Sequence, residues 1–371
     1  MLQDQYGRKL NYLRISLTDR CNLRCKYCMP TEGICGMEQQ DYLTFDEILR
    51  LVRIMAKQGI CKLRLTGGEP FVRDGVPELV QQLCAVEGIE EVDITTNGVI
   101  TKDISWQQLR EYGLHGVNIS LDAVDSAVFR EITGVDGLKL VKKTIQDALT
   151  AGLQVKINCV PVCGINEGEI TSVAELAREY PLEVRFIELM PIGSGADWRG
   201  VDSRQVMEQL ERVFGPLKST DCFEEEVVEP VNSFEEMAGM TNCSAEVAGS
   251  ETFSEETLGP AICYKPNGFV GKIGLISPIS HSFCASCNRI RLTADGKLKT
   301  CLYYDEVLDL RELLRDGICD GVIEKRIREA VYAKPKGHQF QEPEQKFWGQ
   351  ACDVSEQPYE RNHRKMVQIG G

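Results

Sequence analysis

Residues 21–28 of the chain read Cys21-Asn22-Leu23-Arg24-Cys25-Lys26-Tyr27-Cys28, which sets three cysteines at the spacing C-x3-C-x2-C. The residues just before them alternate in polarity like a strand, so the cysteines are expected on a loop that follows a strand. Three thiolates on one short loop can hold three corners of a cubane iron–sulfur cluster and leave its fourth iron open. The alternatives are a zinc site without its fourth ligand and ordinary buried thiols, but zinc sites favour paired C-x2-C units.

Strand-like runs and helical repeats alternate along residues 1–215. Strands are expected at residues 9–17, 60–66, 92–95, 116–120, 153–160 and 182–188. Helices are expected at residues 44–56, 76–86, 104–112, 137–151, 169–179 and 202–214, and a capping box at Thr44 opens the first. This alternation predicts a parallel α/β sheet. Six strands with right-handed crossovers fit a partial barrel, and an open doubly wound sheet would give much the same pattern.

Groups of turn-forming residues follow the expected strands. They are Gly67-Gly68-Glu69-Pro70, Thr95-Thr96-Asn97-Gly98, Ser120-Leu121-Asp122 and Met190-Pro191-Ile192-Gly193, in addition to the cysteine loop. Each group alone is ordinary turn chemistry, because Gly, Pro, Asn and Asp are common in turns. In parallel α/β folds, however, ligands bind at the carboxyl ends of the strands, so the shared placement of these groups indicates a site.

Charge and composition exclude several classes of partner. The chain has 371 residues, a net charge of −14 and 16 cysteines. This acidity argues against binding to nucleic acid, and no apolar run is long enough for a membrane span. The N-terminus lacks the pattern of a secretion signal, so we expect a cytoplasmic protein whose clustered cysteines serve metal or redox chemistry. Eleven acidic residues and no Lys or Arg lie at 221–260, so the remainder, at −3, can still hold a basic pocket.

A second set of three cysteines stands nearer the C-terminus, at Cys284, Cys287 and Cys301. Because His281 precedes them, their spacing fits a Cys3His zinc site as well as an iron–sulfur cluster. Arg289 and Arg291 follow on an expected strand and point the same way, since alternate residues share a face. Two guanidiniums beside a metal centre suit an anionic ligand such as phosphate, although surface ion pairs would use the same residue type.

Together these motifs resemble those of the GTP 3′,8-cyclase family of radical S-adenosylmethionine (SAM) enzymes. The resemblance runs from Tyr6-Gly7-Arg8 through the cysteine loop to Met190-Pro191, and resumes at Tyr264. Its most specific parts are the two cysteine sets, the run Asn288-Arg289-Ile290-Arg291 and the terminal Ile369-Gly370-Gly371. The acidic stretch is longer than is usual in the family, and residues 343–362 look like an additional tail.

The resemblance implies a fold and three regions. The fold is α/β, a partial (β/α)6 TIM-like barrel closed at one side by a C-terminal α+β domain that carries a second iron–sulfur cluster. The barrel is expected at residues 1–215 and an acidic insertion or linker at residues 216–260. The auxiliary-cluster and GTP-binding domain, with its Gly-Gly tail, is expected at residues 261–371.

The resemblance also implies roles for individual residues. Two 4Fe-4S clusters would be held, one by Cys21, Cys25 and Cys28 and the other by Cys284, Cys287 and Cys301. SAM would be bound by Tyr27, Gly68, Glu69, Ser120 and Met190. GTP would be bound by Arg14, Arg64, Thr95, Lys156, Arg289, Ile290 and Arg291. Arg14, Gly370 and Gly371 would act in catalysis, because glycines can enter a crowded, charged pocket and steer a nearby guanidinium.

The implied reaction converts GTP to (8S)-3′,8-cyclo-7,8-dihydro-GTP, the first step of molybdenum cofactor biosynthesis. No side-chain base can break the C3′–H bond of ribose, so a cofactor must supply a radical. The expected partners are an electron donor such as flavodoxin or ferredoxin, and cyclic pyranopterin monophosphate synthase, which would receive the product. The chain would be a monomer or a homodimer. Two alternatives stay open, a radical SAM enzyme that modifies a peptide and a zinc-stabilised interaction protein.

Overall fold

The computed structural model describes residues 1–30, 33, 36–100, 104–220, 260–340 and 364–369. Three regions singled out in the sequence lie outside them. They are residues 221–259 of the acidic segment, the additional tail at 343–362, and the terminal Gly370-Gly371.

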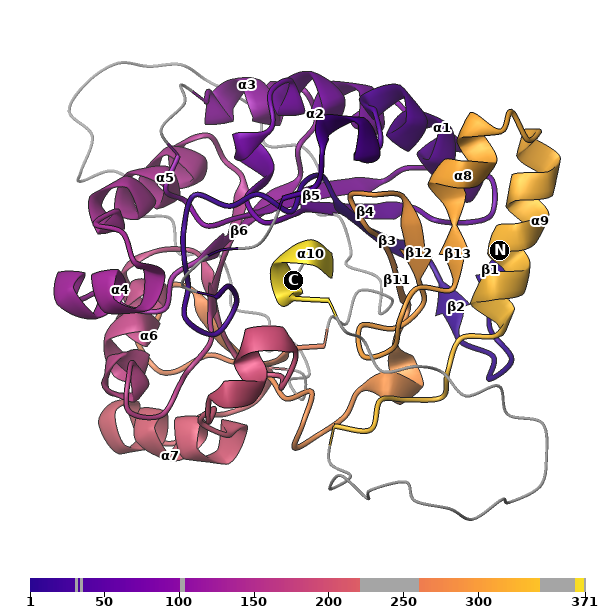
Figure 1. Cartoon of the computed structure of the whole chain (residues 1–371). Coiled ribbons are helices and arrows are strands. Elements are labelled where there is room, and N and C mark those ends of the chain that lie inside the picture. Colours follow the sequence, from indigo (N-terminus) through magenta and orange to yellow (C-terminus); the bar gives the residue numbers. More distant parts are fainter. Residues whose placement is uncertain (31–32, 34–35, 101–103, 221–259, 341–363, 370–371) are drawn as a thin grey trace, which may run out of the picture.

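A sheet of eleven strands forms the centre of the fold (Figure 1). Parallel strands follow the chain in order along its middle: β3 (Tyr12–Ser16), β4 (Lys62–Thr66), β5 (Glu91–Thr96), β6 (Gly116–Ser120), β7 (Gln154–Cys159) and β8 (Glu183–Ile187). Two later strands extend this array in parallel, β10 (Lys272–Ile276) beside β8 and β11 (Arg289–Leu292) beside β3. The antiparallel strands β9 (Ile262–Tyr264), β12 (Lys297–Lys299) and β13 (Leu308–Asp309) form the edges. A separate pair consists of β1 (Leu2–Gln3) and β2 (Lys9–Leu10).

Most helices lie on the outer side of the sheet, whereas α10 (Met366–Ile369) lies within the ring of strands (Figure 1). The α-helices are α1 (Phe45–Ala56), α2 (Val76–Cys84), α3 (Trp106–Glu111), α4 (Ser126–Thr133), α5 (Leu138–Thr150), α6 (Ile170–Glu179), α7 (Ser203–Phe214), α8 (Leu310–Arg315), α9 (Asp320–Tyr332) and α10 (Met366–Ile369). Short 3-10 helices lie at η1 (Gln39–Asp41), η2 (Pro70–Val72), η3 (Glu167–Glu169), η4 (Gly193–Asp197) and η7 (Cys284–Ser286). Not one helix in the described part of the chain has the length and apolarity needed to cross a membrane.

The strands curve into a barrel that stays open between β10 and β11. These two strands are consecutive in the chain, yet β10 pairs with β8 and β9, and β11 pairs with β3 and β12. The connection between them, residues 277–288, therefore passes from one end of the parallel array to the other. The predicted α/β partial barrel is confirmed.

The sequence alternation of the strands separates two layers of the molecule. In β3, Leu13 and Ile15 are fully buried in the hydrophobic core, whereas Arg14 between them lies in register with Arg64 of β4. Leu63 and Leu65 of β4 repeat the pattern. Because successive side chains of a strand point to opposite faces, the apolar face packs under the helices and the polar face lines the barrel interior.

Helix α1 shows how local sequence fixes these elements. The Thr44 side chain accepts a hydrogen bond from the Glu47 amide, and the Glu47 carboxylate accepts one from the Thr44 amide, so the predicted capping box is confirmed. Such a cap stabilises a helix by about 1 kcal/mol. Ile48, Val52 and Met55 recur at helical spacing and are buried against the sheet.

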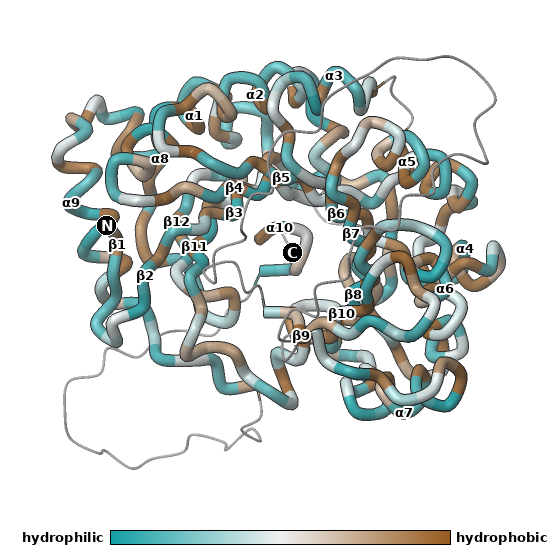
Figure 2. The backbone as a smooth tube through the Cα atoms, turned by 180° about the vertical axis from the view of Figure 1, so that it is seen from behind, coloured by the Kyte–Doolittle hydropathy of each residue, from teal (hydrophilic) through white to brown (hydrophobic). Residues whose placement is uncertain are grey.

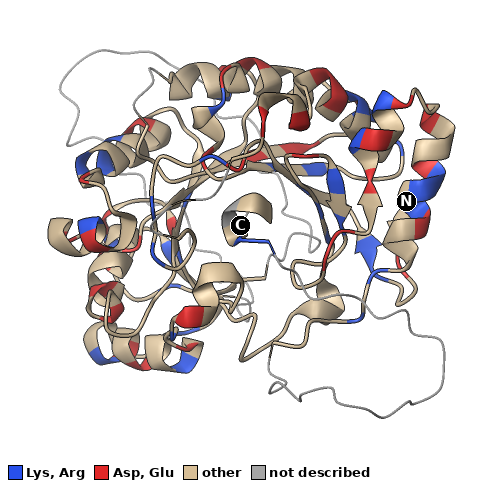
Figure 3. Ribbon diagram, in the orientation of Figure 1, with Lys and Arg blue, Asp and Glu red and all other residues tan. Residues whose placement is uncertain are grey.

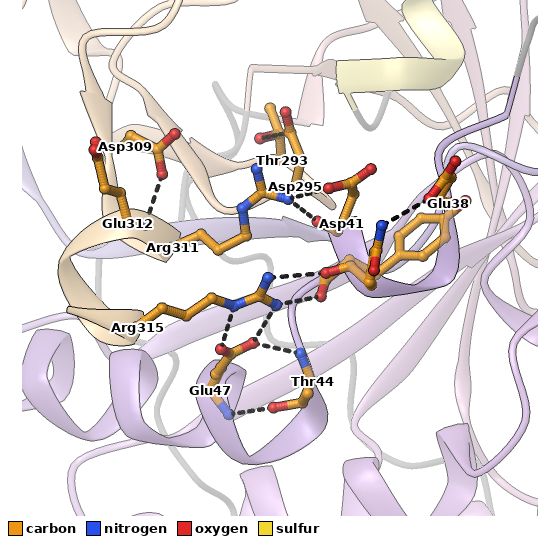
Figure 4. A network of polar contacts seen from close by, with 12 residues as sticks. Glu38, Asp41, Thr44, Glu47, Thr293, Asp295, Asp309, Arg311, Glu312 and Arg315 are labelled. Carbon is orange, nitrogen blue, oxygen red and sulfur yellow. Dashed lines mark hydrogen bonds and ion pairs between the residues drawn. The ribbon is translucent and has the colours of Figure 1, made fainter. Parts of the chain in front are cut away.

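Ion pairs and hydrogen bonds join α8 to the segment that leads into α1 and to the first turn of α1 (Figure 4). Arg315 donates to the Glu47 carboxylate, with Nε 2.9 Å from Oε1, and to the carbonyls of Gln40 and Tyr42. Arg311 donates to the Asp41 carbonyl at 2.5 Å. The segment that follows the cysteine loop is thus held from the far end of the sequence.

Candidate active site

The first three cysteines line a cavity of about 210 Å³, hereafter the cysteine cavity. It lies at the carboxyl ends of the strands, where its walls include Thr66 of β4 and Thr96 of β5. Four of the five residues predicted to bind SAM also line it, namely Tyr27, Gly68, Ser120 and Met190. Residues that are far apart in the sequence therefore meet around Cys21, Cys25 and Cys28, as expected for residues at the carboxyl ends of neighbouring parallel strands.

Glu69 is buried beside this cavity and has an unusual protonation equilibrium. Its carboxylate accepts hydrogen bonds from the amides of Asn97 at 2.7 Å and Phe71 at 3.1 Å, and from Thr96 Oγ1 at 2.9 Å. Burial outweighs these bonds and raises the pKa of Glu69 to about 7. The carboxyl group therefore changes charge near neutral pH, where a cationic ligand group would favour its ionised form.

A hydrogen bond fixes the cysteine loop to the opposite wall of the cavity. Tyr27 Oη donates to Asp122 Oδ2 at 2.7 Å, and Asp122 Oδ1 accepts from the Val160 amide at 2.8 Å. Burial raises the pKa of Asp122 to about 6. Since Tyr27 lies between Cys25 and Cys28, this bond orients the loop that carries both thiols.

The loop suits metal binding better than free thiol chemistry. Burial, followed by the neighbouring Cys28, raises the pKa of Cys25 well above its usual value, so the free thiol is a poor nucleophile. Within the described ranges, no three His, Cys, Asp or Glu side chains gather where a single metal ion could be held. A cubane cluster makes a different demand, because each cysteine binds a different iron, and three thiols around one cavity fit that demand.

A second cavity, of about 460 Å³, lies inside the barrel and is lined by cations; it is called the basic cavity below. Its basic lining residues are Arg14, Lys62, Arg64, Lys156, Arg185, Lys272 and Arg289. Arg291 is buried next to them, in register with Arg14 across the β11–β3 pair. Asn158 and Ile187 line both cavities, so the basic cavity and the cysteine cavity adjoin.

The cations of this cavity are destabilised in the absence of a ligand. Burial is the main cause of the lowered pKa of Arg14, and repulsion from Arg291 adds to it. Burial and then Arg289 lower the pKa of Arg291 to about 10, and burial with Arg185 lowers that of Lys156. An anion would supply the missing opposite charge.

Carboxylates offset only part of this positive charge. Arg64 Nη2 lies 2.5 Å from Asp93 Oδ2, and Arg185 Nε lies 2.6 Å from Glu183 Oε1. Figure 3 shows both signs of charge along the outer helices and on the strands. Seven Lys and Arg residues line the basic cavity, against the three carboxylates of Glu91, Asp93 and Glu183. The basic cavity therefore suits a ligand with several negative charges.

Lys334 and His338 contact the segments that carry the second cysteine set. Lys334, almost fully buried, donates from Nζ to the Arg289 carbonyl at 2.9 Å and also to the Thr300 carbonyl. It thereby joins the segments that carry Cys287 and Cys301. Although burial opposes it, hydrogen bonding to His338 lowers the pKa of Cys284 to about 6. A thiol so easily ionised is a good metal ligand.

Arg8 holds the same region from the other end of the chain. Its guanidinium donates to the carbonyls of Cys284 at 2.7 Å, Lys336 at 2.9 Å and Pro335 at 2.6 Å. Asp4 balances the charge at 2.5 Å. Hydrogen bonds from a charged donor contribute about 1.5–3 kcal/mol each, so this contact gives the Cys284 loop a defined position.

Two of the residues predicted to bind GTP, Thr95 and Ile290, do not line the basic cavity. Thr95 lines the cysteine cavity, next to the basic cavity but outside its lining. The side chain of Ile290 is fully buried in the hydrophobic core, in register with Leu13, so only its backbone could meet a ligand. Gly370 and Gly371 lie beyond the described residues.

Sequence reasoning missed other residues of the site. Arg185 was detectable, because Glu183, Arg185 and Ile187 alternate with apolar residues along β8 and all line the basic cavity. Lys334 and Asn118 carried no such signal, since an isolated polar residue has no pattern that separates a site from a surface position.

The described end of the chain lies inside the barrel. Figures 1 and 2 view the molecule from opposite sides, and both place α10 within the ring of strands. Met366 of α10 lines the cysteine cavity. Arg364 donates from Nη2 to Asp295 Oδ2 at 2.8 Å and from Nη1 to Oδ1 at 3.0 Å, in the turn between β11 and β12. Its Nε forms an ion pair with Glu306 Oε1 at 2.7 Å.

Known proteins resemble this chain over its whole length. Residues 15–177 match the Radical SAM superfamily, and residues 231–340 match the Molybdenum Cofactor Synthesis C family. The GTP 3′,8-cyclase of Moorella thermoacetica is 39% identical over 100% of both chains, and that of Clostridium perfringens is 37% identical over 100% of both.

A solved structure shares the fold at much lower sequence identity. Streptococcus suis SuiB, in its crystal structure bound to S-adenosylmethionine, aligns with a TM-score of 0.55 at 14% identity, over 86% of this chain and 68% of that one. This likeness concerns the fold alone, whereas the full-length relatives define the group. The chain therefore belongs to the radical SAM superfamily and, within it, to the GTP 3′,8-cyclase family.

Proposed function

We propose that this protein converts GTP to (8S)-3′,8-cyclo-7,8-dihydro-GTP, the first step of molybdenum cofactor biosynthesis. The observation that carries the proposal is the adjoining pair of cavities, one lined by three cysteines and the other by seven Lys and Arg residues. A radical-generating site and a site for a polyanionic nucleotide share a wall in one barrel. The names of the full-length relatives support GTP as the nucleotide.

Membership of the radical SAM superfamily supports SAM and an iron–sulfur cluster as cofactors. Cys21, Cys25 and Cys28 would hold the cluster, while Gly68, Ser120, Met190 and the Tyr27 backbone would hold SAM. When bound, these cofactors supply the radical that removes hydrogen from C3′ of the substrate. The chain itself positions Tyr27 through Asp122, and the buried Glu69 carboxylate would pair with the SAM amino group. Apolar wall residues such as Leu23, Phe129 and Ile187 help to exclude water.

The basic cavity would bind the triphosphate of GTP. Arg14, Arg64, Lys156, Arg289 and Arg291 come from four strands, β3, β4, β7 and β11, so they surround a ligand instead of meeting it from one side. Guanidiniums match phosphate oxygens in geometry. A bound anion would relieve the mutual repulsion that, after burial, lowers the pKa values of Arg14 and Arg291. Arg14 is the proposed proton donor of the final step, with the Gly370-Gly371 tail orienting it.

Cys284, Cys287 and Cys301 would hold a second 4Fe-4S cluster. Cys284 and Cys287 lie just before β11, the strand of Arg289 and Arg291, and Cys301 lies just after β12. The acidified Cys284 thiol and the Lys334 bridge support this assignment. An external electron donor of the flavodoxin or ferredoxin type, transfer of the product to cyclic pyranopterin monophosphate synthase, and a cytoplasmic location that keeps thiols reduced belong to the same proposal.

An anaerobic assay with GTP, SAM and dithionite tests the proposal. The wild-type protein should form 5′-deoxyadenosine and a nucleotide isomeric with GTP in mass, separable by chromatography. Cys25→Ser leaves too few thiolates for the first cluster, so both products should vanish while the fold and GTP binding persist. Two results would contradict the proposal. One is a wild-type protein that carries both clusters and does not make the isomer, and the other is formation of 5′-deoxyadenosine by Cys25→Ser.

A further inference from the structure

Polar side chains on three neighbouring strands stand where the two cavities adjoin. Thr95 of β5 lies in register with Asn118 of β6, and Ser120 of β6 with Asn158 of β7. Thr95 lines the cysteine cavity, Asn118 lines the basic cavity and Asn158 lines both. The boundary between the cavities therefore runs along these residues.

Each of the three carries a buried oxygen that lacks a hydrogen-bond partner within the part of the chain that the structure describes. These atoms are Thr95 Oγ1, Asn118 Oδ1 and Asn158 Oδ1. Asn118 is 2% exposed, so its amide oxygen is also shielded from solvent. Buried polar atoms of native proteins are nearly always bonded, so an unsatisfied oxygen in a cavity wall is prepared for a donor on a ligand.

The position of Asn118 indicates which part of the ligand it meets. Its neighbour in register on β7 is Lys156, one of the cations of the basic cavity. If the triphosphate lies among these cations and the reacting carbon C3′ faces the cysteine cavity, the ribose must occupy the boundary. A side chain on the basic-cavity side of that boundary then faces the sugar of the substrate and not the cofactor.

We propose that Asn118 is a further substrate-binding residue, which accepts a hydrogen bond from the ribose 2′-hydroxyl and selects ribonucleotides over 2′-deoxyribonucleotides. This inference rests on the proposed function. The hydrogen at C3′ must point into the cysteine cavity, so the 2′- and 3′-hydroxyls, on the opposite face of the ribose, both point away from it. Of these two donors we assign the 2′-hydroxyl to Asn118, because its carbon is not the one that reacts. A site built to bond a hydroxyl rejects a ligand that lacks it, because the buried acceptor is then left unpaired.

Binding measurements on the cluster-loaded protein, without reductant so that no turnover occurs, test the inference. Titration calorimetry under anaerobic conditions would compare GTP with 2′-deoxy-GTP. The wild-type protein should prefer GTP by about tenfold or more. Asn118→Ala should bind GTP about tenfold more weakly and bind 2′-deoxy-GTP as the wild type does, so that discrimination is lost. Asn118→Ser is the substitute should the alanine variant fail to fold.

Thr150→Val provides the control, because it removes a hydroxyl of α5 that bonds the Gln146 carbonyl at 2.8 Å, and neither residue lines either cavity. It should leave both affinities unchanged. Equal weakening of the two ligands in Asn118→Ala, or unchanged discrimination, would overturn the role of Asn118 while leaving the proposed function intact. A wild-type protein that binds neither nucleotide would refute the proposed function itself.

Discussion

Glu69 and Asp122 are buried carboxyl groups beside the same cavity, and their surroundings suit them to different tasks. Asp122 accepts a hydrogen bond from Tyr27 Oη and so orients the cysteine loop. Glu69 accepts only from neutral donors, and burial leaves its pKa at about 7. A cationic ligand group nearby would therefore stabilise the ionised form of Glu69, which couples ligand binding to pH.

The affinity for SAM should accordingly increase between pH 6 and pH 8, by several-fold and at most about tenfold, as Glu69 loses its proton. The sign follows from the shift: a carboxyl group whose pKa is raised above its usual 4.5 is protonated at low pH and attracts the SAM ammonium only once ionised. The same raised pKa lowers the free energy of unfolding of the ligand-free protein as the pH rises from about 4.5 to 7. Calorimetric titrations of wild type and Glu69→Gln would check this, and identical pH profiles for the two proteins would count against it.

At the scale of residues, the cysteine sets and the strand arginines stood out in the sequence, whereas the side chains that hold them in place did not. The cysteines were recognisable because three thiols at fixed spacing on one loop are rarely accidental. Arg289 and Arg291 were placed correctly on a strand, since alternation gives orientation as well as structure. Asn118 and Lys334 were not predictable, because their importance depends on what the fold brings against them.

Helices α1 and α4 illustrate what could be predicted for whole elements. The capping box and regular apolar repeat fixed the start and end of α1 correctly. Helix α4 was missed, although Asp125 caps it by accepting from the amides of Ala127 and Val128 and Gly134 ends it with φ 74°. The Ser120-Leu121-Asp122 group just before α4 was interpreted as turn chemistry, and a helix of only eight residues offers a weak periodic signal.

Arg364 anchors the segment that leads into helix α10. Arg364 fastens it to the β11–β12 turn through Asp295 and to Glu306. At its other side, a Cβ on Gly193 would lie 3.1 Å from Lys365 Cα, so the segment passes very close to the loop after β8. The C-terminal segment thus touches structure near both ends of the open barrel.

Arg364→Met should release this segment, because the variant keeps the length of the side chain and loses its charge-assisted bonds. We expect carboxypeptidase to remove C-terminal residues about tenfold faster than from the wild type, as followed by intact mass. Arg328→Met is the control, since it breaks an exposed ion pair with Glu324 on α9. Equal digestion rates for wild type and Arg364→Met would contradict the anchoring role.

In the anaerobic assay with GTP, SAM and dithionite, Arg364→Met and a variant lacking Gly370 and Gly371 should both cleave SAM yet yield less cyclised product.

For the whole molecule, the open barrel explains why one chain combines two cysteine sets. The strands from residues 261–309 join both ends of the parallel array, β10 beside β8 and β11 beside β3. The connection between them carries Cys284 and Cys287 past the barrel opening. The strand–helix order could be predicted from sequence for the N-terminal part, where each unit repeats. It could not be predicted for the later strands, whose partners lie more than two hundred residues away in the case of β11 and β3.

An isotope transfer experiment tests most directly whether the adjoining cavities bring C3′ of GTP next to SAM. The protein would be incubated anaerobically with SAM, dithionite and GTP that carries deuterium only at C3′. We expect the 5′-deoxyadenosine formed to contain deuterium, in proportion to the cyclised nucleotide. Unlabelled 5′-deoxyadenosine beside deuterated GTP, or equal labelling when the deuterium is placed at C2′ instead, would contradict this placement.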